Sequence, residues 1–95
     1  MVYVVLEHEI HDFETLKQVY TDDAERRRRM GCRGGRIWRG ADDPNMVTVI
    51  MEWDTVENAR EFAGSFELEQ AMEWSTSNVA TPRVTVLDVA MESPR

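Results

Sequence analysis

The two histidines of this chain are its best candidates for acid–base chemistry. His8 lies near the end of a predicted strand, on the same face as Val4 and Leu6, and His11 follows in the turn before a predicted helix. An imidazole titrates near neutral pH, so a histidine in a pocket can act as a general base. We therefore predict His8 as the catalytic residue. The alternatives are that His8 bonds the backbone at the strand end or lies at a contact between two subunits.

A metal site is not expected at these histidines. Glu7 and Glu9 flank His8, but neighbouring side chains of a strand point to opposite faces. The spacing of these residues also matches no zinc signature. We predict no metal and no cofactor.

Aromatic and methionine side chains in the predicted strands suit a flat, mostly apolar ligand. Tyr3 belongs to the first strand, Trp38 to the second, and Met51 and Trp53 to the third. We predict these four as the residues that bind the substrate. The alternative, for the tryptophans here and for Trp74, is packing in the core or at an interface.

Two other stretches resemble anion sites but have a simpler explanation. The arginines at 26–29 follow Asp22, Asp23 and Glu25 in sequence, and acid-before-base pairs at a spacing of four residues stabilise a helix. The glycine-rich residues 31–35 lack the Lys-Ser/Thr ending of a phosphate loop. We interpret them as a helix end and a strand start at which the backbone passes another group closely.

Composition excludes several classes of protein. The chain has 95 residues, enough for a single domain over residues 1–95, and a net charge of −7. That charge argues against nucleic acid and anionic membrane as partners. Cys32 is the only cysteine, which fits a reducing compartment, and no signal peptide or membrane-spanning run is recognisable. We predict a soluble, cytoplasmic protein.

The hydrophobic pattern predicts the order strand, helix, strand, strand, helix, strand. Strands are expected over residues 2–8, in a hairpin over 36–53 with its turn at 42–45, and over 84–90. Helices are expected from Asp12 to Gly31 and from Asp54 to Ser75, each with its aspartate as the N-cap, and a loop over 76–82. The second helix is interrupted near Ser65, and the first is expected to bury a stripe of Phe13, Leu16, Tyr20 and Ala24. This order is typical of the ferredoxin-like α+β fold, a four-stranded antiparallel sheet with both helices on one face.

The other face of that sheet needs a cover. The strands carry apolar side chains on both faces, as Val49 and Ile50 show, and an exposed apolar sheet marks an interaction surface. We predict a homodimer that packs its sheets face to face, with Val49 and Val86 at the interface.

The chain resembles the dimeric α+β barrel superfamily, the antibiotic-biosynthesis-monooxygenase-like group. The most telling stretches are residues 19–31, 39–45, 53–54 and 59–62. It is most similar to small single-domain members with cyclase-like or monooxygenase-like names. The resemblance implies a barrel formed by two sheets and, in each subunit, a cleft between sheet and helices. In catalytic relatives that cleft takes flat aromatic or polyketide-like substrates, haem, or small reactive metabolites.

The resemblance leaves three functions open. Haem degradation is not expected, because residues 54–75 contain no histidine and residues 2–7 no asparagine, which that branch uses. The first function is a cofactor-independent monooxygenase or a cyclase acting on a small, mostly apolar or aromatic metabolite, with His8 as the base. The second is a non-catalytic dimer that binds or senses a small molecule. The third is an accessory protein that docks another protein.

Overall fold

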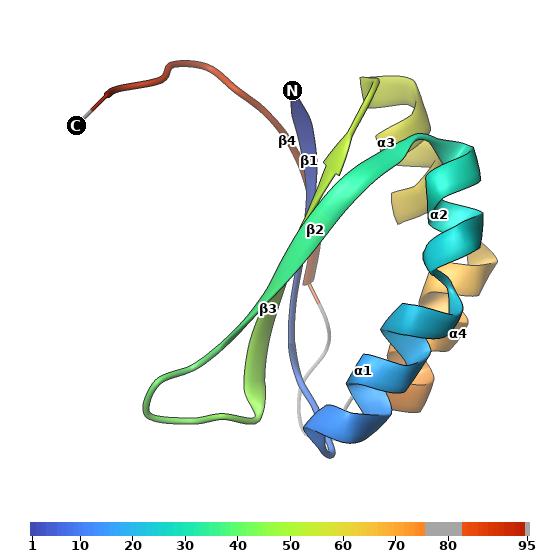
Figure 1. Cartoon of the computed structure of the whole chain (residues 1–95), viewed down its shortest axis with the longest axis vertical. Coiled ribbons are helices and arrows are strands. Elements are labelled where there is room, and N and C mark those ends of the chain that lie inside the picture. Colours follow the sequence, from blue (N-terminus) through green and yellow to red (C-terminus); the bar gives the residue numbers. More distant parts are fainter. Residues whose placement is uncertain (76–82, 95) are drawn as a thin grey trace.

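The chain forms an antiparallel sheet with helices on one face (Figure 1). The computed structural model describes residues 1–75 and 83–94, apart from the side chains of residues 73–75. Within them the elements are β1 (Val2–Glu9), α1 (Phe13–Asp22), α2 (Ala24–Met30), β2 (Cys32–Arg39), β3 (Met46–Trp53), α3 (Val56–Ala63), α4 (Phe66–Ser75) and β4 (Arg83–Asp88). The strands pair in the order β2-β3-β1-β4, antiparallel throughout. The predicted ferredoxin-like α+β fold is confirmed.

The first predicted helix is divided into α1 and α2. Asp12 caps α1 as expected, because its carboxylate accepts a hydrogen bond from the Thr15 amide at 2.9 Å. The break falls at Asp23, which ends α1 and begins α2. Gly31 ends α2 with a φ of +121°, a backbone conformation that favours glycine.

The second predicted helix is likewise divided, and it begins one residue later than expected. Thr55 is the N-cap of α3, and its hydroxyl accepts from the Asn58 amide at 3.1 Å. Asp54 accepts from the Asn58 side chain at 3.0 Å instead, so the prediction of Asp54 as the N-cap was wrong. Ser65 separates α3 from α4, and its hydroxyl accepts from the Leu68 amide at 3.2 Å.

The alternating side chains of the sheet lie on a covered face, under the helices, and an open face opposite. The covered face carries Val2, Val4, Leu6 and His8 of β1 and Val47, Val49, Met51 and Trp53 of β3, all 6 % exposed or less. The open face carries Tyr3, Val5 and Glu7 of β1 and Thr48, Ile50 and Glu52 of β3. Because the covered residues are almost all apolar, they form most of the core.

The two residues predicted at a subunit interface lie on the covered face. Val49 is 1 % exposed inside the core, and Val86 is paired with Val4, so it shares the face of Val4. The assignment of these two residues to the interface was therefore wrong. Both faces of β3 carry apolar side chains, and their alternation does not show which face the helices cover. The open face has its own large apolar side chains, among them Trp38 and Leu87, 46 % and 48 % exposed.

The last strand is shorter than expected. It ends at Asp88, not at Ala90, and the segment after it leaves the sheet on the side away from the helices (Figure 1). The predicted loop over 76–82 lies outside the described residues. In the part of the chain that the structure describes, no helix is long and apolar enough to cross a membrane.

Candidate functional site

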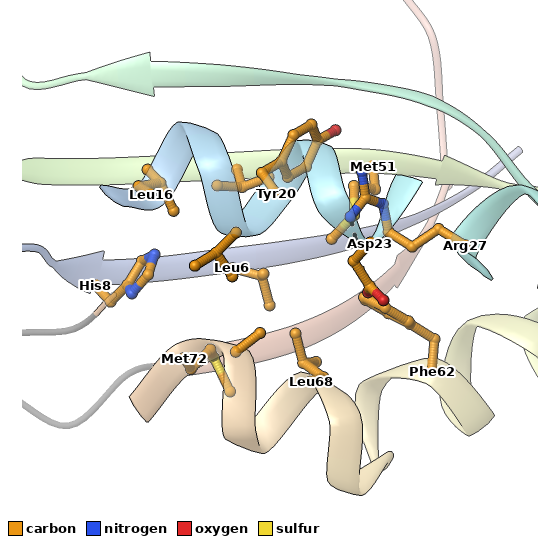
Figure 2. A pocket seen from close by; sticks show the side chains of 13 residues that line it. Leu6, His8, Leu16, Tyr20, Asp23, Arg27, Met51, Phe62, Leu68 and Met72 are labelled. Atoms are coloured by element: carbon orange, nitrogen blue, oxygen red, sulfur yellow. Dashed lines mark ion pairs between the residues drawn. The ribbon is translucent and has the colours of Figure 1, made fainter. Parts of the chain in front are cut away.

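A small cavity lies between the covered face of the sheet and the helices α1, α2, α3 and α4 (Figure 2). It is lined by Leu6, His8, Leu16, Val19, Tyr20, Asp23, Arg27, Val49, Met51, Phe62, Leu68, Ala71 and Met72. Most of these side chains are apolar, and four carry groups that can ionise. The cavity volume is about 40 Å³, which is room for about three water molecules.

His8 is the imidazole of this cavity. It comes from β1, where it is paired with Val47, and it is 3 % exposed. Burial lowers the pKa of His8 below its ordinary value of 6.5, because an imidazolium is poorly solvated in an apolar site. At neutral pH the ring is therefore uncharged, which is the state that can accept a proton. His11 is exposed in the turn before α1 and does not line the cavity.

A guanidinium, that of Arg27, also lines the cavity. Arg27 is 6 % exposed, and its guanidinium carbon lies 4.0 Å from the centre of the Tyr20 ring. Such a cation–π contact offsets part of the cost of burying a charge. Nη1 of Arg27 lies 3.8 Å from Oδ2 of Asp23. Figure 2 shows His8 at one end of the cavity and Arg27 with Asp23 at the other.

Sequence reasoning missed Arg27, because the arginines at 26–29 are interpreted there as helix-stabilising partners of the preceding acidic residues. The pattern did contain a signal. Leu16, Tyr20, Asp23 and Arg27 follow one another at spacings of four, three and four residues and all line the cavity, which is the spacing of one helical face. The predicted stripe continued to Ala24 instead, and Ala24 is exposed.

Tyr20 is held in place by a close approach to β2. Its hydroxyl oxygen lies 2.6 Å from the point where a Cβ atom on Gly35 would stand, so only glycine leaves room for it. This confirms the interpretation of the glycine-rich stretch as a close passage of the backbone. Burial raises the pKa of Tyr20, and the nearby charge of Arg27 opposes that shift.

The four predicted substrate-binding residues divide between the two faces of the sheet. Met51 lines the cavity. Trp53 is completely buried beside it, with its ring centre 4.9 Å from that of Phe62. Tyr3 and Trp38 lie on the open face, where they line a shallow recess. The side chain of Trp74 lies outside the described residues.

Among the described residues, no group of three or more His, Cys, Asp or Glu side chains is arranged to hold a metal ion. The polar groups of the cavity are one imidazole, one phenol, one carboxylate and one guanidinium. The imidazole, the phenol and the carboxylate can accept or donate a proton, and the guanidinium can pair with an anion.

Comparison with known proteins gives the same architecture. No protein-family model and no curated protein matches the chain. Solved structures do match. SnoaB from Streptomyces nogalater, a cofactor-independent oxygenase, superposes with a TM-score of 0.74 at 16 % identity, over 99 % of this chain and 97 % of SnoaB. This chain has the antibiotic biosynthesis monooxygenase fold.

Two further structures agree with that assignment. A protein from Deinococcus radiodurans, provisionally described as an antibiotic biosynthesis monooxygenase, has a TM-score of 0.70 at 16 % identity, over 100 % of this chain and 98 % of its own. Rv0793 from Mycobacterium tuberculosis has a TM-score of 0.68 at 19 % identity, over 97 % of each chain. The resemblance noted in the sequence is confirmed, and at these identities the likeness concerns the fold.

Proposed function

We propose that this chain binds a small, mostly apolar or aromatic metabolite in the cavity and oxidises it without a cofactor. The observation that carries the proposal is His8, a neutral imidazole buried in a mostly apolar cavity. An uncharged base in such a site can remove a weakly acidic proton from a bound ligand. The fold, shared with a cofactor-independent oxygenase, supports the same reaction class.

In the proposed reaction, His8 accepts a proton from an activated methylene group of the substrate. The resulting carbanion passes its electrons to dioxygen. The methylene becomes a carbonyl, one oxygen atom of dioxygen enters the product, and the other leaves as water. The reaction needs no external reductant, because the substrate itself supplies the electrons.

Substrate entry requires the cavity to open. Its volume of about 40 Å³ is far below the ~300 Å³ or more of ordinary ligand pockets. Met51 and Met72 line it, and methionine side chains change conformation easily. Figure 2 shows Leu16 on α1 facing Met72 on α4 across the cavity, so separation of α1 from α4 is the simplest way to enlarge it.

We also propose that the protein is a homodimer that buries the open face of its sheet. Tyr3, Val5, Trp38, Ile50 and Leu87 give that face its apolar character. Trp38 and Leu87 are exposed and the other three are half-buried, and an apolar sheet face of this kind favours association. A cytoplasmic location also stays a prediction, supported by the single cysteine.

Anthrone, a flat tricyclic ketone with an acidic methylene, is a suitable probe of the reaction. Anthrone should raise the melting temperature of the wild-type protein. With anthrone, the wild-type protein should consume dioxygen faster than the spontaneous oxidation of anthrone does. His8→Gln should lower the rate by about a hundredfold or more, the usual contribution of a general base. His11→Gln is the matched control, because His11 is exposed outside the cavity, and it should keep the wild-type rate.

The small cavity also supports a second candidate, a non-catalytic protein that binds a small molecule. Stabilisation by anthrone without dioxygen uptake would favour this candidate. An equal rate for wild type and His8→Gln would remove His8 from the reaction. Absence of both stabilisation and uptake, repeated with other flat quinones and phenols, would leave the accessory-protein function.

A further inference from the structure

We infer that the ligand of the cavity carries an anionic oxygen group, which pairs with Arg27, on a flat apolar body. The inference rests on the proposed function in one respect, that the cavity binds a small molecule. It adds the chemical class of that molecule and a binding residue.

The first reason is that Arg27 is a buried cation without a close carboxylate partner. Its Nη1 lies 3.8 Å from Asp23, whereas a charge-assisted hydrogen bond between such groups is about 2.7–2.9 Å long. A buried charge is stabilised only when it is paired and hydrogen-bonded. Arg27 stacks on the Tyr20 ring at 4.0 Å and shares a side-chain hydrogen bond with it, but the neutral phenol does not compensate the charge of the guanidinium.

The second reason is that Asp23 already has a closer partner. Nε and Nη2 of Arg26 donate to its two carboxylate oxygens at 2.7 and 2.9 Å. This paired geometry neutralises Asp23, and Arg27 then adds a positive charge. Glu67 lies near Asp23 in a neighbouring recess, and its charge acts on Arg26. With Glu67 counted, the two arginines and two carboxylates balance. Only Arg27 and Asp23 of these four line the cavity, and Asp23 has its closest partner in Arg26, so Arg27 is the cation left to face a ligand.

The third reason is the position of Arg27 in the cavity. Arg27 and His8 lie at opposite ends, with apolar side chains such as Leu6 between them (Figure 2). A guanidinium has five N–H donors in its plane, so those that Tyr20 does not engage can meet a ligand along the edge. A carboxylate or an enolate oxygen there fixes one end of the ligand and directs the other end toward His8.

The test uses two ligands of the same shape, naphthoate and the naphthamide of the same ring position. They differ in charge, and titration calorimetry gives both dissociation constants. Wild type should bind naphthoate about tenfold more tightly, in line with a hydrogen bond to a charged group. Arg27→Gln should bring the two constants together, mainly by weakening naphthoate. Arg28→Gln is the matched control, because Arg28 is exposed and paired with Glu25 at 2.8 Å, and it should keep the preference.

The outcomes separate the inference from the proposed function. Equal binding of the two ligands by wild type, or a naphthoate preference that survives Arg27→Gln, overturns the inference and leaves the cavity as a binding site. Absence of binding by either ligand overturns both. Should Arg27→Gln fail to fold, NMR of wild type decides, because the Arg27 side-chain N–H resonances should shift with naphthoate and stay in place with naphthamide. Equal shifts with both ligands refute the inference.

Discussion

Replacement of Gly35 by alanine tests how β2 and α1 fit together around the cavity. An added Cβ atom would lie 2.6 Å from the Tyr20 hydroxyl, 2.9 Å from the Ile50 carbonyl oxygen and 3.0 Å from Met51 Cγ. Tyr20 and Met51 can rotate away, but the Ile50 carbonyl belongs to the neighbouring strand and cannot move without the sheet. Some strain therefore remains after the side chains have adjusted.

The expected cost is that of adding a methyl group to a packed site, about 1–3 kcal/mol. For a domain of this size that corresponds to a fall in melting temperature of roughly 5–20 °C. Urea denaturation followed by tryptophan fluorescence measures the free energy of unfolding directly. The displaced Tyr20 should also release the Arg27 stacked on it, so naphthoate should bind more weakly.

Gly64→Ala is the matched control for this experiment. An added Cβ atom there would meet the Arg60 carbonyl oxygen at 3.5 Å, an ordinary contact, and the φ of Gly64 is −97°, which alanine adopts freely. It should leave the free energy of unfolding within about 0.5 kcal/mol of wild type or raise it slightly. If Gly35→Ala were as stable as Gly64→Ala, Tyr20 would not pack against β2 as described.

Three further predictions concern the base, the core and the open face. Burial lowers the pKa of His8 below 6.5 in the folded protein, so as pH falls the unfolded chain takes up the proton first. Wild type should therefore lose stability relative to His8→Gln as pH falls through about 6.5, and the loss should be complete below the pKa of His8 in the folded protein. Urea curves at neutral and acidic pH measure that difference. Phe62→Ala should cost about 3–5 kcal/mol in the same assay, because Phe62 is 1 % exposed, whereas Phe66→Ala, at a position 69 % exposed, should cost little. In light scattering, Leu87→Asp should give folded monomers from the proposed dimer, whereas Val49→Asp should unfold the chain; a dimeric Leu87→Asp would contradict the proposed interface.

The sequence by itself determined the local elements and their order. Residues 42–45 form the predicted turn between β2 and β3, closed by a hydrogen bond from the Met46 amide to the Asp43 carbonyl at 3.0 Å. Asp12 and Gly31 mark the start of α1 and the end of α2 as expected. These features depend on residues a few positions apart, whose preferences act wherever the segment lies.

Only the tertiary structure decided which side of each element is buried. Val49 and Ile50 are adjacent and both apolar, yet Val49 lies under the helices and Ile50 lies on the open face. Arg27 belongs to a run of four arginines, yet it alone of the four is buried, beside Tyr20. The alternation of side chains along a strand or a helix defines the two sides of that element. It does not define which other element packs on each side. That choice depends on contacts between residues far apart in the chain, which local preference does not encode.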